Sequence, residues 1–171
     1  MIIAGGIFCR RNGIPMLSAA DALALAAPPG ILLGRIANFI NAELWGRPSD
    51  VPWAMVFPTD PLGLPRHPSQ LYEAFLEGFV LMVVLIWLVW VRRSLHEPGR
   101  TAGIFFAGYG IGRFIVEWFR ESDPQFYLDN PYGYAFYWGE YGLSMGQLLS
   151  LPMIAIGLLL ASWARRRAAL A

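Results

Sequence analysis

The segment from Leu71 to Val91, LYEAFLEGFVLMVVLIWLVWV, decides the fold class of this 171-residue chain. It has the length of about 20 residues with which an α-helix crosses the hydrocarbon core of a bilayer. Three other apolar segments have a similar length: Leu17 to Ile40, Thr101 to Phe119 and Ser144 to Ala164. The pattern predicts an all-α, polytopic integral membrane protein with four spans in a single membrane domain, residues 1–171.

The composition agrees with a membrane protein and excludes other classes. Hydrophobic residues make up 56% of the chain and charged residues 15%, against about 25% charged residues in soluble domains. The 13 basic residues, all arginine, nearly balance the 12 acidic ones, so the net charge of +1 gives no field that would attract nucleic acid. The single Cys9 cannot form an intrachain disulfide, and no Cys/His cluster has the spacing of a metal site. We expect no metal, no cofactor and a small apolar packing role for Cys9.

Two segments depart from a simple pattern of spans. Residues Met1 to Cys9 are apolar and precede Arg10 and Arg11, which reverses the order of a secretory signal peptide. They are too few to span a bilayer, so residues 1–9 predict a truncated helix, and we expect the chain to begin within a fold. In the first span, Pro28-Pro29-Gly30 predicts a break, either a kink or a re-entrant segment.

The distribution of arginine predicts the topology, because clusters of basic residues stay in the cytoplasm. Such clusters occur at Arg10-Arg11, at Arg92-Arg93 with Arg100, and at Arg165-Arg166-Arg167. Residues 41–70 and 120–143 then form two ordered periplasmic loops, and the C-terminus is cytoplasmic. The loops carry aromatic residues expected to form a belt at the membrane interface: Trp45, Trp53, Tyr127, Tyr132, Tyr134, Tyr137, Trp138 and Tyr141.

The run from Gly34 to Arg47, GRIANFINAELWGR, places ionisable and amide groups at the outer end of the first span. On a helix, Arg35 and Asn38 share a face. An arginine at the centre of a membrane helix costs about 2.5 to 3.5 kcal/mol on insertion scales, so it usually faces a cavity, a partner or a ligand. In the alternative interpretation, Arg35 extends to the lipid headgroups and pairs with Glu43.

A second polar run, Gly108 to Glu121, sets Tyr109, Arg113 and Glu117 at successive i, i+4 positions, so that a polar stripe crosses an apolar helix. The stripe is either a functional site or a structural ion pair between Arg113 and Glu117. The helix also contains glycines that would allow close approach of a neighbouring helix or a headgroup. These are Gly103, Gly108, Gly110 and Gly112.

Polar residues also gather where each loop enters the following span. In RHPSQLYE, Arg66 to Glu73, His67 could exchange protons near neutral pH, or it merely precedes a turn fixed by Pro68. Ser69 could cap the next helix, in which Glu73 and Glu77 lie one turn apart. In GLSMGQ, Gly142 to Gln147, Ser144 and Gln147 could cap the last span or lend polar groups to a pocket.

Arg35 and Arg113 are expected at a similar depth in the outer leaflet, each with amide or carboxylate neighbours. A guanidinium group makes planar, bidentate hydrogen bonds to phosphate oxygens. The two residues therefore predict a site for the anionic headgroup of a phospholipid.

These motifs resemble those of the prolipoprotein diacylglyceryl transferase family. The run from Gly34 to Arg47 is similar to the family signature G-R-I-G-N-F-I-N-G-E-L-W-G-R, with Ala37 and Ala42 in place of glycine. The other three runs follow in the family's order. The resemblance implies transfer of the diacylglyceryl group of phosphatidylglycerol to the lipobox cysteine of a preprolipoprotein, in the bacterial inner membrane. This reaction is the first step of lipoprotein maturation.

The resemblance also implies roles for individual residues. Arg35 would bind the phosphate of phosphatidylglycerol in a pocket shaped by Asn38, Glu43 and Gly46. Catalytic roles fall to three residues, with Arg113 stabilising the departing phosphate: Arg113, Glu117 and Tyr109. Supporting positions are His67, Gln70, Glu73, Ser144 and Gln147.

The sequence resembles the C-terminal part of the family. Family members carry earlier helices and a His-Gly-Gly motif ahead of the position of Met1, with a histidine proposed as the base, and this chain contains neither. Two alternatives therefore stay open: an inactive fragment that binds lipid or signal peptide, and a small transporter subunit, since paired intramembrane charges also mark ion paths.

Overall fold

Helices dominate the computed structural model, which describes residues 2–122, 133–138 and 141–170. The helices are α1 (Ile2–Arg11), α2 (Met16–Ile40), α3 (Ser69–Glu73), the π-helix η1 (Ala74–Val80), α4 (Leu81–Trp90), the short 3-10 helix η2 (Ser94–His96), α5 (Arg100–Val116) and α6 (Met145–Ala169). Two antiparallel hairpins complete the described structure: β1 (Met55–Val56) with β2 (Pro65–Arg66), and β3 (Phe136–Trp138) with β4 (Tyr141–Leu143).

Three helical segments in the described part of the chain are long and apolar enough to cross a membrane: Met16–Ile40, Ser69–Trp90 and Met145–Ala169. They confirm an all-α membrane protein. The fourth predicted span is also a helix, but α5 has only 17 residues, so its crossing of the bilayer stays a prediction. Only 17% of the most apolar window of α2, and 17% of that of α6, is buried inside the structure, as expected of helices that face lipid.

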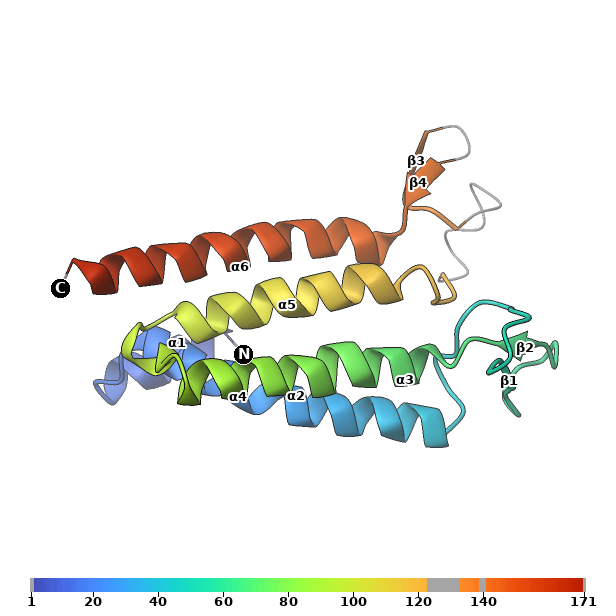
Figure 1. Cartoon of the computed structure of the whole chain (residues 1–171), viewed down its shortest axis with the longest axis horizontal. Coiled ribbons are helices and arrows are strands. Elements are labelled where there is room, and N and C mark those ends of the chain that lie inside the picture. The colour runs from blue at the N-terminus through green and yellow to red at the C-terminus, as the bar shows by residue number, and fades with distance from the viewer. Residues whose placement is uncertain (1, 123–132, 139–140, 171) are drawn as a thin grey trace.

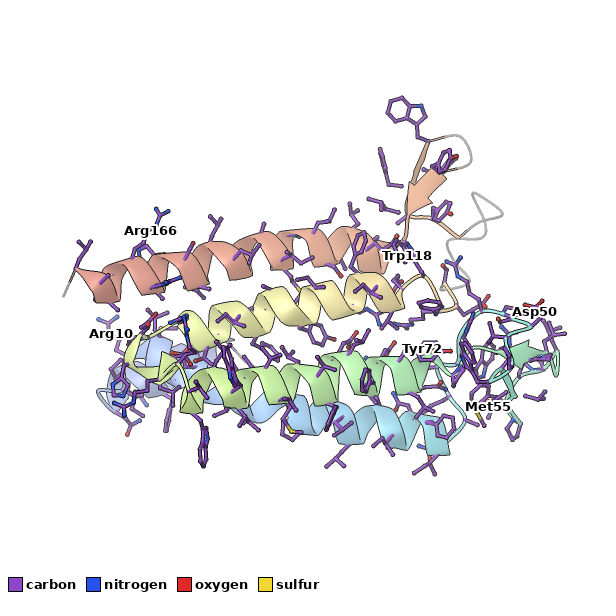
Figure 2. All side chains as sticks on the ribbon, in the orientation of Figure 1. Arg10, Asp50, Met55, Tyr72, Trp118 and Arg166 are labelled. Atoms are coloured by element: carbon purple, nitrogen blue, oxygen red, sulfur yellow. The ribbon has the colours of Figure 1, made fainter. Side chains whose placement is uncertain are left out.

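The long helices lie roughly parallel, with alternating direction along the chain (Figure 1). Helix α5 packs between α6 on one side and α2 with the continuous α3, η1 and α4 on the other. Both hairpins lie at one end of the helices. Arg10 and Arg166 lie at the opposite end from Asp50 and Met55 (Figure 2). The described parts of the two predicted loops thus share one end of the molecule, as the arginine clusters predict; which side of the membrane that end faces stays a prediction.

The aromatic residues of the loops fall into two groups. Trp53, Tyr137, Trp138 and Tyr141 are exposed, as expected of a belt at the membrane interface. Trp45 and Tyr134 are instead half-buried. The Cζ atom of Arg66 lies 3.9 Å from the centre of the Trp45 ring. Two further predicted members, Tyr127 and Tyr132, lie outside the described residues.

One of the two predicted forms of a break in the first span, a re-entrant segment, is wrong. Helix α2 continues from Met16 to Ile40 through Pro28 and Pro29. The fixed φ of proline fits a helix. Each proline destabilises the helix only through its missing N–H donor and the crowding of its ring against the preceding turn. Pro28 is fully buried, so packing against neighbouring elements offsets part of that loss. Whether the helix bends there stays a prediction.

Small residues bring the helix backbones together, as the glycines of α5 predict. A Cβ atom at Gly103 would lie 2.7 Å from the carbonyl oxygen of Gly157 on α6, and one at Gly157 would lie 2.6 Å from the oxygen of Gly103. On another face of α5, Gly112 leaves room for Glu77. A hydrophobic cluster of Leu81, Leu85 and Leu88 on α4 packs against α5. Cys9 is buried with a free thiol, in agreement with a packing role.

The start of α5 is capped by a residue that the sequence did not single out. The carboxylate of Asp21, in the second turn of α2, accepts hydrogen bonds from the backbone N–H groups of Gly99 and Ala102, both at 2.8 Å. These groups are among the unpaired donors at the first turn of a helix. Gly99 holds a φ of 96°, which favours glycine there. A side chain of one helix thus caps the next.

We predict that Asp21→Ala destabilises the chain by about 2 kcal/mol, because it leaves two buried N–H groups without an acceptor. Thermal unfolding of the chain in detergent, followed by circular dichroism, would show a midpoint several degrees lower. Asp50→Ala, which changes an exposed aspartate, is the matched control. Equal midpoints for the two variants would contradict the capping role.

Candidate functional site

The Glu73 carboxylate, at the end of α3, joins three helices. Its Oε2 atom lies 2.6 Å from Nε of Arg35 on α2, and its Oε1 atom lies 3.0 Å from Nη1 of Arg113 on α5. The Glu73 side chain is only 3% exposed, whereas the arginines keep 22% and 16% of their side-chain surface. The two predicted arginines therefore meet at one carboxylate, and both remain partly accessible.

Arg113 also pairs with Glu117, with 2.9 Å between Nη2 and Oε2. This confirms the ion pair that the i, i+4 spacing predicts. The Glu117 carboxylate lies against Gly146 at the start of α6, where an added Cβ atom would come within 2.7 Å of Oε1. Glycine is thus required for this approach.

A pocket of about 200 Å³ lies where α5 ends and α6 begins. Arg113 and Glu117 line it together with polar and apolar residues of both chain segments. These are Arg120, Glu121, Ser122, Gly133, Ser144, Met145, Gly146 and Leu149. Arg113 thus faces a cavity as well as its ion-pair partners.

The alternative pairing of Arg35 with Glu43 is wrong. Glu73 takes that place because it lies buried on the facing helix, whereas Glu43 is exposed in the turn after α2. Asn38 connects Arg35 with Glu43 when its amide is oriented so that both of its polar atoms have hydrogen-bond partners. Its oxygen then accepts from Nη1 of Arg35 at 3.3 Å, and its nitrogen donates to Oε1 of Glu43 at 3.2 Å.

The turn after α2 is conformationally demanding. Ala42 and Leu44 have φ values of 55° and 58°, a region that non-glycine residues rarely adopt. The substitution of alanine for glycine at position 42 therefore matters through backbone conformation rather than through packing alone. The Thr59 hydroxyl donates to the Ala42 carbonyl and holds the turn.

Arg66 organises the loop at this end of the bundle. Its guanidinium group donates to both oxygens of Asp60, at 2.7 and 3.1 Å, to Glu121 at 3.0 Å and to the carbonyl of Gly46 at 3.3 Å. The hydrogen bond from Arg66 holds the pKa of Asp60 below its usual range. Sequence reasoning missed this role because the partners are scattered along the chain.

His67 belongs to an aromatic cluster rather than to the arginine network. Its Nδ1 atom lies 3.1 Å from the Tyr72 hydroxyl, which also accepts from Nε1 of Trp53 at 2.7 Å. The Phe119 ring packs edge-on against it. Burial lowers the pKa of the His67 imidazole and favours its neutral form. The structure thus gives His67 a role in loop packing.

The remaining supporting residues bind backbone groups. Gln70 donates to the Glu43 carbonyl at 2.7 Å, and Ser69 donates to the Leu44 carbonyl at 3.1 Å. The prediction that Ser69 caps the helix is wrong, since Pro68 occupies the cap position. Ser144 and Gln147 form a reciprocal capping box on α6, which confirms their predicted cap.

Tyr109 lies one turn before Arg113 and packs against Phe105, with 6.0 Å between ring centroids. Its hydroxyl is a neighbour of Glu77 on η1. The predicted stripe on α5 therefore meets two carboxylates of the facing helix, Glu73 through Arg113 and Glu77 beside Tyr109.

Comparison with known proteins finds one family. A sequence model described as prolipoprotein diacylglyceryl transferase matches residues 1–163. Proteins named phosphatidylglycerol–prolipoprotein diacylglyceryl transferase are similar to the chain. That of Ruegeria pomeroyi is 57% identical over 167 residues, covering 92% of this chain and 57% of the relative. That of Roseobacter denitrificans is 56% identical, covering 98% and 60%. That of Azospirillum brasilense is 53% identical, covering 95% and 58%. The chain spans about three fifths of the length of these relatives.

We predict that Gly46→Ala loosens the loop and lowers the unfolding midpoint. A Cβ atom there would lie 2.8 Å from the His67 carbonyl oxygen and 2.9 Å from its Cβ atom, so the hydrogen bond from Gly46 to His67 at 2.9 Å could not persist. Gly34→Ala, at a position with no atom within 4 Å of an added Cβ, is the control. Thermal unfolding in detergent measures both variants, and a midpoint at wild-type level for Gly46→Ala would show that the loop accommodates the methyl group.

Proposed function

Because this chain belongs to the prolipoprotein diacylglyceryl transferase family, we propose that it transfers the diacylglyceryl group of phosphatidylglycerol to the lipobox cysteine of a preprolipoprotein. The observation that supports this most directly is the meeting of Arg35 and Arg113 at Glu73. Two guanidinium groups at one level of a helix bundle form a site for a phosphate.

The arginines retain donors for a ligand. Each guanidinium group carries five N–H donors in a rigid plane. Arg35 uses donors on Glu73 and Asn38, and Arg113 uses donors on Glu73 and Glu117. The carboxylates hold each plane in place, so the remaining N–H groups are oriented before a phosphate arrives. Partial burial strengthens such contacts, because the local dielectric constant is lower than that of water.

The reaction follows from the chemistry of the substrates. The thiol loses its proton, since thiolate is the competent nucleophile, and the sulfur forms a bond to the glyceryl carbon. The carbon–oxygen bond breaks, and its electron pair leaves with glycerol phosphate. Arg113 stabilises the negative charge that develops on this leaving group. Glu117 orients Arg113, and Tyr109 lines the site.

The other predicted residues shape the headgroup pocket. Asn38 and Glu43 position Arg35, and Gly46 lets the loop close over the end of the helices. A second set supports these residues: His67, Gln70, Glu73, Ser144 and Gln147. We assign the active face to the periplasmic side of the bacterial inner membrane, with four spans and a cytoplasmic C-terminus. The partners are phosphatidylglycerol, the signal peptide of a preprolipoprotein and the bilayer.

Binding of the headgroup without transfer is the second candidate, because the contacts of Arg35 and Arg113 at Glu73 concern the headgroup and not the thiol. The same arginine pair would serve this function. Family membership argues against the transporter alternative.

We predict that membranes containing this chain, phosphatidylglycerol and a lipobox peptide yield a diacylglyceryl adduct detectable by mass spectrometry. Arg113→Ala should lower the rate of adduct formation about 100-fold or more. This is the typical effect of removing a hydrogen-bond donor that stabilises negative charge in the transition state. Arg35→Lys also lowers the rate, because lysine lacks the planar fork. Arg92→Lys, at the far end of the helices, is the matched control.

A chain extended upstream through the His-Gly-Gly motif is assayed in parallel. Adduct from the extended chain alone would favour headgroup binding as the function of the shorter one. Adduct that persists in Arg113→Ala would contradict the assigned role of that arginine.

A further inference from the structure

Glu77 is a buried carboxyl group whose oxygens make no hydrogen bond of normal geometry with the described residues, although the Tyr109 hydroxyl is a neighbour. Its side chain is 0% exposed, and neither of its oxygens has a partner of normal geometry among the described residues. The other buried carboxylates of the described chain are compensated: Asp21 by backbone N–H groups, and Asp60, Glu73 and Glu117 by arginines. An unpaired buried polar group requires an explanation, because the hydrogen bonds that it loses to water on burial are not replaced.

The groups that face Glu77 come from three helices. Glu73 lies one turn away on its own helix, Tyr109 and Arg113 lie on α5, and Arg35 lies on α2. Glu77 therefore borders the ion-pair network proposed to bind phosphate. Gly112 on α5 makes room for it, since an added Cβ atom there would lie 3.2 Å from Cγ of Glu77.

The local backbone also marks this position. Glu77 lies in the middle of η1, the π-helix Ala74–Val80. π-helical turns are rare and frequently occur at functional sites. The turn of a π-helix is wider than that of an α-helix, because its hydrogen bonds join residues i and i+5. The segment is thus irregular at the residue that lacks a partner.

The charge of the network favours a neutral Glu77. Arg35 and Arg113 are already balanced by Glu73 and Glu117. A third carboxylate would give the network a net negative charge and repel a phosphate. Burial of an ionised carboxyl group without a partner is also far costlier than burial of the neutral acid.

We propose that Glu77 is a positioning residue for the anionic headgroup, held as a neutral carboxylic acid beside Glu73; this inference rests on the proposed function. A neutral acid leaves both guanidinium groups available to phosphate and carries one O–H donor. When phosphate binds the remaining N–H groups of the arginines, the Glu77 hydroxyl donates to the Glu73 carboxylate and holds it in place between them. Glu77 acts through Glu73 and does not touch the phosphate.

The test compares Glu77→Leu, which keeps an apolar volume without a donor, with Glu77→Gln, which keeps a neutral donor. Phosphatidylglycerol bound per chain is measured by native mass spectrometry in mixed micelles, with phosphatidylcholine as the zwitterionic comparison. A hydrogen bond to a charged group corresponds to about tenfold or more in affinity, so Glu77→Leu should weaken binding by about that factor. Glu77→Gln should restore it to within about threefold of wild type. Circular dichroism establishes that both variants are folded.

A spectroscopic measurement tests the protonation state directly. The infrared difference spectrum between wild type and Glu77→Gln at neutral pH should contain the C=O band of a protonated carboxylic acid. The absence of that band would overturn the proposal. So would binding by Glu77→Leu at wild-type strength, or binding by Glu77→Gln as weak as that of Glu77→Leu. If the wild type binds phosphatidylglycerol no better than phosphatidylcholine, the headgroup site itself fails, and this inference fails with it.

Discussion

The contact of the Glu73 carboxylate with two arginines is the interaction on which the rest of the site depends. One buried carboxylate pairs with Arg35 on α2 and with Arg113 on α5, and so joins three helices at one level. A buried charge is tolerated only when partners compensate it. Each arginine also needs a carboxylate partner, because it is partly buried among the helices. The pairing with Glu73 therefore holds both guanidinium groups at the end of the helices that carries the loops. The proposed phosphate site is a consequence of this mutual compensation.

Features set by local sequence could be predicted. The apolar length of a span, the i, i+4 pairing of Arg113 with Glu117, and the capping box of Ser144 and Gln147 each depend on residues within one turn or one segment. The structure confirms them. The similar depth of Arg35 and Arg113 in the outer leaflet predicted one headgroup site. Their meeting at Glu73 could not be predicted, because the two arginines lie in different helices.

Features that depend on which helices meet could not be predicted. Spacing along the chain offers Glu43 as the alternative partner of Arg35, whereas its partner Glu73 lies on the facing helix. Asp21 caps α5 across a helix contact, and no cap pattern within one segment reveals this. The π-helical turn around Glu77 likewise has no signature in hydropathy, since its residues read as an ordinary apolar span.

The central claim is that Glu73 couples the two arginines, and a double-mutant cycle of Arg35→Gln and Arg113→Gln tests it most directly. Either single variant leaves Glu73 with one cation, whereas the double variant leaves a buried carboxylate with none. The thermal unfolding midpoint of the chain in detergent should therefore fall by more in the double variant than the two single losses combined, since residues in one ion-pair network are not additive. Losses that simply add would contradict the account and would show that the arginines are held independently.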